Sequence, residues 1–281
     1  MSARPEDATM PWSAARLDHA LAASRAQRRA ALGLYLPVGY PTRAASLDAL
    51  HQMAQSADVL ELGVPHTSPV LDGPVIQEAV AQALDNGFRM RDVFTAAREL
   101  TAASTAALLV MSYWKPIEEF GALAFADQLA AAGGAGVLIP DLPDAAAATW
   151  HEAARAAGLH TVPLIPPHAS DARLAEIGAA SSGMVYAPAT PGRTGVRRPL
   201  SPYLPRLVRR LREATGLPVG VGIGISTPDQ ARWVSGYADA AVVGSAVIRR
   251  MHAHADAPAA AAAEAAREFA DGVRHPLRPT A

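Results

Sequence analysis

The sequence predicts a single-domain closed (β/α)8 barrel, a TIM barrel, and three observations support this fold class. Short apolar runs that end in Gly, Pro or polar residues alternate with longer stretches of helical spacing, the pattern of repeated βα units. About eight such runs occur, and several lack alternating polar residues, as expected for parallel strands buried on both faces. The length of 281 residues suits a fold of roughly 250 residues. A doubly wound open sheet remains the alternative.

The predicted strands are the apolar runs themselves, taken in chain order. They are LGLYLPV near Leu34, DVLELG ending near Glu61, AALLVMS ending near Ser112, GVLIPD ending near Asp141, TVPLIP near Leu164, GMVYA ending near Tyr186, LPVGVG ending near Gly222, and DAAVVG ending near Gly244.

Helices are predicted in the gaps between these strands, and start residues mark several of them. PVIQEAVAQAL opens with Pro74 in its first turn, Ser170 is the expected cap of SDARLAEIGAA, and Thr227 is the expected cap of TPDQARWVSG. Outside the repeats, residues 16–31 predict an extra N-terminal helix and residues 257–274 a closing C-terminal helix.

No long linker divides the chain, so residues 1–281 are expected to form one domain with flexible tails at 1–12 and 275–281. The net charge of -1 and the pI near 6.8 give no general attraction to nucleic acid or to an anionic membrane. The absence of cysteine excludes disulfides and thiolate chemistry, and the scattered histidines predict no metal site. The N-terminus lacks the features of a signal peptide, so we expect a soluble, cytoplasmic protein.

Two carboxylates in the stretch ADVLELGVPHTSPVLDGP are candidates for chemistry. Glu61 ends an apolar run, and Asp72 follows in a turn rich in Gly and Pro. The carboxyl ends of barrel strands face the active site, and a carboxylate among apolar neighbours has a raised pKa that suits acid and base catalysis. The alternatives are structural: Glu61 would cap a helix or pair with an arginine, and Asp72 would cap the helix that begins at Pro74.

Two glycine-rich turns late in the chain predict a phosphate site. The seventh and eighth strands run into GVGIGIS (220–226) and VGSA (243–246), and the loops after these strands commonly bind phosphate in barrels. We therefore expect phosphate at Gly224, Gly244 and Ser245, although glycine can also serve only to permit tight turns. The GVGIG pattern lies too late in the chain to indicate a dinucleotide site.

The connection YAPATPGRTGVRRP after the sixth strand is longer than a simple βα loop and predicts a mobile lid. The predicted lid contains Gly192, Arg193 and Thr194, and the adjacent Gly195 is a further candidate for phosphate binding.

Together these segments resemble the tryptophan synthase alpha subunit family from about Leu34 to Arg249. The shared motifs are LPVGYPT, ELGVPxxxPxxDGPxIQ, SYWKP, IPDLP, GRTG, GIGIS and VGSA, in the order of the family. The resemblance implies a (β/α)8 barrel that cleaves indole-3-glycerol phosphate to indole and glyceraldehyde 3-phosphate by retro-aldol chemistry, without a cofactor.

The resemblance also implies roles for single residues. Glu61 matches the acid/base residue of the family, and Asp72 matches the carboxylate that accepts the indole N–H and stabilises positive charge on that ring. The two carboxylates are expected to differ because one lies among apolar groups and the other in a polar turn. The remaining matches are Tyr186 near Glu61, Tyr35 beside the indole, Thr194 as a lid residue that bonds Asp72 on closure, Gly195, Gly224, Gly244 and Ser245 around the phosphate, and Leu138, Ile165 and Ile223 in the indole pocket.

Departures from the family pattern fall at the expected partner surface. Ser68 stands where the family usually has an aspartate that pairs with a lysine of the beta subunit, and Lys115 stands where the family favours Asn. Arg193 replaces a common Val in the lid. These changes indicate drift, a matching change in this organism's own beta subunit, or a paralogue that releases indole without a beta partner.

Two other classes of function compete with the lyase. One is a non-catalytic protein that binds indole or a sugar phosphate and regulates a beta subunit, but phosphate binding needs neither Glu61 nor Asp72. The other is a different phosphate-binding barrel, such as an isomerase or indole-glycerol phosphate synthase. A synthase uses a catalytic lysine, and the only lysine here is Lys115.

Overall fold

Eight parallel strands form one sheet in a computed structural model of the chain, which describes residues 12–166, 169–189 and 199–277. Each predicted apolar run overlaps one strand. The strands are β1 (Ala31–Pro37), β2 (Val59–Gly63), β3 (Ala107–Met111), β4 (Gly136–Leu138), β5 (His160–Val162), β6 (Val185–Pro188), β7 (Val219–Gly222) and β8 (Ala240–Val243).

The sheet closes into a barrel, as the sequence predicts. Neighbouring strands follow the order β5-β4-β3-β2-β1-β8-β7-β6, which leaves β5 and β6 as the two edges. A parallel bridge between Leu164 and Tyr186 joins these edges just beyond the end of β5. The amide of Ile165 donates to the Tyr186 carbonyl at 2.8 Å, and the amide of Tyr186 donates to the Pro163 carbonyl at 2.9 Å. The open doubly wound sheet is therefore excluded.

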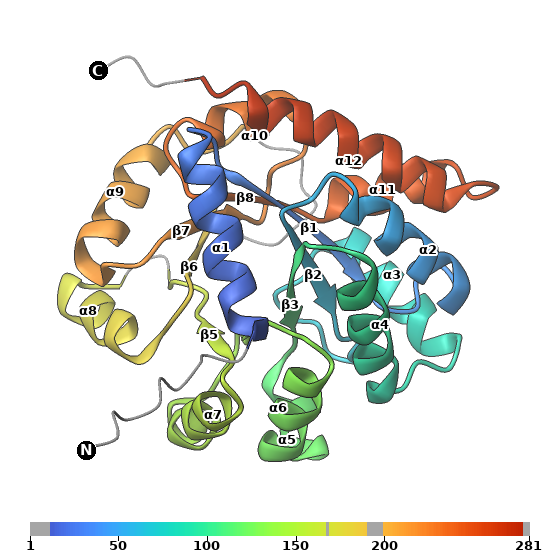
Figure 1. Cartoon of the computed structure of the whole chain (residues 1–281), viewed down its shortest axis with the longest axis horizontal. Helices are drawn as coiled ribbons and strands as arrows, with labels where there is room; N and C mark the ends of the chain where they lie inside the picture. Colours follow the sequence, from blue (N-terminus) through green and yellow to red (C-terminus); the bar gives the residue numbers. More distant parts are fainter. Residues whose placement is uncertain (1–11, 167–168, 190–198, 278–281) are drawn as a thin grey trace, which may run out of the picture.

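Helices surround the barrel, and α1 crosses one of its ends (Figure 1). The predicted caps are confirmed, because the Ser170 hydroxyl accepts from the Arg173 amide and the Thr227 hydroxyl from the Gln230 amide, both at 3.2 Å. The helices are α1 (Trp12–Ala26), α2 (Arg43–Ala54), α3 (Pro74–Asp85), α4 (Met90–Ala103), α5 (Trp114–Phe120), α6 (Ala122–Ala131), α7 (Asp144–Ala157), α8 (Asp171–Ala180), α9 (Leu204–Thr215), α10 (Pro228–Ser235), α11 (Ser245–Ala253) and α12 (Pro258–Arg274).

The N-terminal helix ends earlier than the sequence predicts. The expected helix spans 16–31, whereas α1 ends at Ala26 and β1 already begins at Ala31. Arg28 adopts a left-handed backbone with φ of 58°, which ends the helix. Glycine is the usual residue at such a position, so the sequence gives no signal for this helix end. The closing helix at 257–274 is confirmed as α12, and residues 1–11 and 278–281 of the predicted tails lie outside the described residues.

A cluster of hydrogen bonds and ion pairs around Asp239 connects α1 to the end of the barrel where the strands begin. Asp239, just before β8, accepts from Arg25 of α1 at 2.9 Å, from Arg212 of α9 at 2.8 Å and from the Val219 amide of β7 at 2.9 Å. This end is therefore covered and braced, which leaves the opposite end for ligands.

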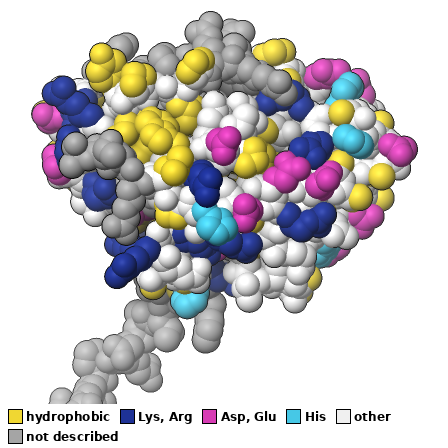
Figure 2. Space-filling view, turned by 90° about the horizontal axis from the view of Figure 1, so that it is seen from above, with side chains coloured by type: hydrophobic (Ala, Val, Ile, Leu, Met, Phe, Trp, Pro, Cys, Tyr) yellow, Lys and Arg dark blue, Asp and Glu magenta, His cyan; other side chains and the backbone are white. Residues whose placement is uncertain are grey.

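On the side formed by α10 and α12, basic and acidic side chains are interspersed (Figure 2). Arg250 of α11, for example, pairs with Glu264 at 3.1 Å and with Glu268 at 2.8 Å. No helix in the described part of the chain is long and apolar enough to span a bilayer.

Candidate active site

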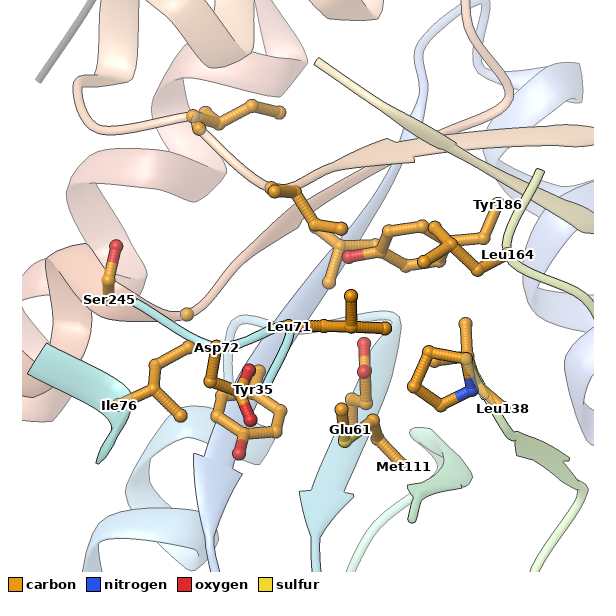
Figure 3. Close-up of a pocket in the computed structure, with 16 residues that line it drawn as sticks. Tyr35, Glu61, Leu71, Asp72, Ile76, Met111, Leu138, Leu164, Tyr186 and Ser245 are labelled. Carbon is orange, nitrogen blue, oxygen red and sulfur yellow. The ribbon is translucent and has the colours of Figure 1, made fainter. Parts of the chain in front are cut away.

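A cavity lies at the carboxyl ends of the strands, and residues from all eight strands or the segments directly after them line it (Figure 3). Its wall is mostly apolar, with two carboxylates and two tyrosines among the aliphatic side chains. The lining residues are Tyr35, Glu61, Leu71, Asp72, Ile76, Met111, Leu138, Pro140, Leu164, Tyr186, Ile223, Gly224, Ile225, Val242, Gly244 and Ser245.

Glu61 projects from β2 into this cavity (Figure 3). It lies in the middle of its strand beside Tyr35 of β1, so it caps no helix, and the ion pairs among the described residues do not include it. The side chain is buried, and burial together with the negative charge of Asp72 raises the pKa of Glu61 from 4.5 to about 8. Glu61 is therefore mainly protonated at neutral pH.

Asp72 is also buried, which differs from the polar turn that the sequence suggests. The N-cap of α3 is Gly73, so Asp72 does not cap this helix, and its carboxylate instead accepts a hydrogen bond from the Tyr113 hydroxyl at 3.1 Å. Burial raises the pKa of Asp72 from 3.8 to about 6, although the bond from Tyr113 opposes this rise. At neutral pH one carboxyl group of the cavity is thus mainly ionised and the other mainly protonated.

Two tyrosines occupy spaces that glycines leave open. A side chain at Gly222 would overlap the Tyr186 hydroxyl, and a Cβ atom at Gly244 would lie 2.9 Å from the Tyr35 ring. Burial raises the pKa of both tyrosines well above 10, so both hydroxyls stay protonated and neutral beside the carboxyl groups. Gly244 therefore seats an aromatic ring as well as lining the cavity, a packing role that the sequence does not reveal.

The predicted phosphate residues Gly224, Gly244 and Ser245 line the same cavity. Gly244 is the N-cap of α11 and Ser245 its first residue, so the N-terminus of this helix, where an anion is favoured, adjoins the cavity. The loop after β7 has left-handed backbone at Ile223 (φ 58°) and Gly224 (φ 124°). Such a conformation is uncommon for isoleucine and is typical of functional loops.

The other predicted residues divide into three groups. Tyr35, Leu138 and Ile223 line the cavity as expected, whereas Ile165 is buried outside its lining and Leu164 takes that place. Successive residues of an extended segment point to opposite sides, which explains the exchange. The lid residues Gly192, Arg193, Thr194 and Gly195 lie outside the described residues.

Ser68 and Lys115 both lie on the rim that surrounds the cavity. Ser68 is exposed on the loop between β2 and α3, and Lys115 is exposed near the start of α5, just after β3. The Lys115 ammonium lies 3.7 Å from the Glu119 carboxylate, an exposed pair of little energetic weight.

Two residues that support Asp72 were not singled out from the sequence. Tyr113 belongs to the motif SYWKP, and Gln77 to the motif DGPVIQ. The side-chain amide of Gln77 in α3 donates to the backbone carbonyl of Asp72 at 2.9 Å and to that of Pro69 at 3.3 Å. These bonds anchor the loop between β2 and α3 to the helix. The only sequence signal for these roles is that each motif contains a residue with a polar side chain.

Comparison with known proteins identifies the family of the chain. Residues 21–274 match the family model described as tryptophan synthase alpha chain. This chain belongs to that family. The alpha chain from Streptomyces avermitilis is 47% identical over 263 residues, covering 92% of this chain and 94% of that protein. The alpha chain from Streptomyces coelicolor is 46% identical over 264 residues, with coverage of 92% and 96%.

Solved structures agree with this family membership. A structure of Mycobacterium tuberculosis tryptophan synthase matches with a TM-score of 0.86 and 39% identity, covering 92% of this chain and 98% of that chain. The alpha subunit from Legionella pneumophila matches with a TM-score of 0.83 and 31% identity, with coverage of 92% and 98%. The family resemblance seen in the sequence is confirmed, and the alternative of an unrelated phosphate-binding barrel is excluded.

Proposed function

We propose that Glu61 and Asp72 together cleave indole-3-glycerol phosphate in this chain. As a member of the tryptophan synthase alpha chain family, the chain is a carbon–carbon lyase of tryptophan biosynthesis that forms indole and glyceraldehyde 3-phosphate. The observation that supports the two roles is that both carboxyl groups are buried in one cavity and have different pKa values. A purely regulatory binding protein would need neither group.

The reaction needs a proton at indole C3 and a base for the neighbouring hydroxyl group. Protonated Glu61 donates its proton to C3, which places positive charge on the ring nitrogen, and the ionised Asp72 accepts the N–H and stabilises that charge. The Glu61 carboxylate then removes the hydroxyl proton. The O–H electrons form the carbonyl, the carbon–carbon bond breaks, and its electrons return to the ring as indole. Glu61 ends the cycle protonated, so the step is balanced without a cofactor.

The rest of the cavity suits the two ends of this substrate. The start of α11 with Gly244 and Ser245, together with Gly224, offers amide groups to the phosphate. Leu138 and Leu164 offer apolar surface to the indole ring. The predicted lid, which includes Thr194, would cover the site after binding, but it lies outside the described residues.

The chain is proposed to act with a tryptophan synthase beta subunit. Its relatives are alpha chains, and one of the structural neighbours is a tryptophan synthase. Ser68 and Lys115 lie on the cavity rim, where a partner would receive the indole. We further propose a cytoplasmic location, as for a soluble biosynthetic enzyme.

Initial rates of indole release from indole-3-glycerol phosphate test the two roles. Glu61→Gln and Asp72→Asn should each lower kcat by at least about 100-fold, because each removes a group required for proton transfer or charge stabilisation. Glu152→Gln, which changes an exposed glutamate of α7, should leave the rate unchanged. A Glu61→Gln enzyme that keeps more than about a tenth of the wild-type rate would overturn the proposed role of Glu61.

A further inference from the structure

Tyr113 lies directly behind Asp72 in the structure. It follows β3, is only 2% exposed, and is not among the residues that line the cavity. Its hydroxyl group donates to Oδ2 of Asp72 at 3.1 Å and accepts from the Leu71 amide at 3.0 Å. The hydroxyl is therefore fixed between a catalytic carboxylate and the backbone of the loop that carries it.

The Leu71 amide and the ionised Asp72 together determine the direction of the bond between Tyr113 and Asp72. A backbone N–H can only donate, so the phenol oxygen must accept from it. The phenol carries a single proton, and that proton is then directed at Asp72. A donor held in this way stabilises the ionised carboxylate more than the protonated form, because hydrogen bonds to a charged acceptor are stronger.

We infer that Tyr113 is a positioning residue that holds Asp72 ionised and correctly oriented for the reaction. The inference rests on the proposed role of Asp72 and adds a residue that does not itself face the substrate. Because Tyr113 also holds the Leu71 amide, it fixes one wall of the cavity as well as the charge within it.

The surroundings of Asp72 otherwise favour its protonated form, so the hydrogen bond from Tyr113 is needed to keep it ionised. Burial is the main influence on the pKa of Asp72 and favours the neutral form, whereas the hydrogen bond from Tyr113 opposes it. The other groups that interact with this pair by charge carry negative charge or none. They are Glu61 of β2, Tyr35 of β1, Tyr186 of β6 and Asp141 after β4. The His66 ring, which packs against Tyr113, can become positive, but burial lowers its pKa below 6.5.

Packing and backbone contacts hold the Tyr113 ring in place independently of its hydroxyl. The His66 ring lies against it with centroids 5.8 Å apart, and the Ser112 hydroxyl donates to the Tyr113 carbonyl at 2.9 Å. Tyr113→Phe should therefore keep the ring and remove only the hydroxyl group. Tyr237→Phe is the matched control, because the Tyr237 hydroxyl is buried without a hydrogen-bond partner among the described residues.

The test is the pH dependence of kcat/KM for indole release by the wild type, Tyr113→Phe and Tyr237→Phe. Loss of the donor should move the acid limb of Tyr113→Phe upward by about one pH unit, so that activity falls about tenfold below pH 6. Near pH 8 the variant should approach the wild type, because Asp72 is ionised in both. The Tyr237→Phe profile should coincide with that of the wild type.

A second replacement changes the same bond in the opposite direction. Fluorotyrosine at position 113 is a more acidic donor of nearly the same shape, so it should move the acid limb to lower pH. An unmoved acid limb in both variants, or a loss in Tyr113→Phe that is equal at all pH values, would overturn the inference. If the wild type released no indole even with a beta subunit added, the proposed function would fail instead, which keeps the two failures distinct.

Discussion

Glu61→Gln should make the folded protein more stable at alkaline pH while it abolishes cleavage. The folded-state pKa of Glu61 is raised, so the folded protein keeps this proton to higher pH than the unfolded chain does. The contribution of Glu61 to stability must therefore fall as the pH rises from about 4.5 to about 8 and then level off. Glutamine has the shape of the protonated acid and does not titrate, so the variant escapes this loss.

The size of the effect follows from the pKa values. The interval between 4.5 and about 8 corresponds, at about 1.4 kcal/mol for each pH unit, to about 5 kcal/mol of unfolding free energy. This is an upper value, because water that enters the cavity solvates the carboxylate. A gain of about 2 to 5 kcal/mol for the variant above pH 8 is therefore expected, and it should vanish near pH 4.5.

Urea unfolding of wild type and Glu61→Gln at about pH 5 and about pH 9 measures this difference directly. The comparison cancels the titrating groups that do not interact with Glu61. Glu152→Gln, which changes an exposed glutamate of α7 far from the cavity lining, serves as the control. A stability difference that is the same at both pH values would refute the raised pKa of Glu61.

Three further outcomes follow from the geometry. The profile of kcat/KM should be bell-shaped, falling below about pH 6 as Asp72 is protonated and above about pH 8 as Glu61 loses its proton; a flat profile from pH 5 to 9 would contradict this. Gly222→Ala should displace the Tyr186 hydroxyl and lower kcat by at least about tenfold, as steady-state kinetics would detect. Asp239→Ala should lower the free energy of unfolding by about 3 kcal/mol in urea near neutral pH, because two arginines and a backbone amide lose their acceptor. A decrease of less than about 1 kcal/mol would contradict a stabilising role for Asp239.

Much of the fold could be predicted because each barrel strand is a local apolar run. The caps Ser170 and Thr227 were predictable for the same reason, since a cap depends on residues within one turn. The end of α1 was not predictable, because the chain turns at Arg28 through a backbone conformation that arginine rarely adopts. Composition gives no sign of such a turn.

The site was predictable where position on a strand fixes direction, as for Glu61 and Tyr186. It was less predictable where the outcome depends on contacts between distant loops. Asp72 looked like a residue of a polar turn, but Tyr113, which lies 41 positions later, buries and binds it. The exchange of Ile165 for Leu164 is a shift of one residue, which reverses the side of an extended segment that faces the cavity.

The most direct test of the lyase is indole release from indole-3-glycerol phosphate by the purified chain, alone and with a tryptophan synthase beta subunit. We predict slow release by the chain alone and a steep rise when the beta subunit is added, because the partner favours the closed state of the site. Fast release without a partner would contradict the proposed dependence on beta. It would also explain why Ser68 and Lys115 depart from the family pattern at the partner surface, since a stand-alone enzyme does not need that surface. No release under either condition would contradict the lyase itself.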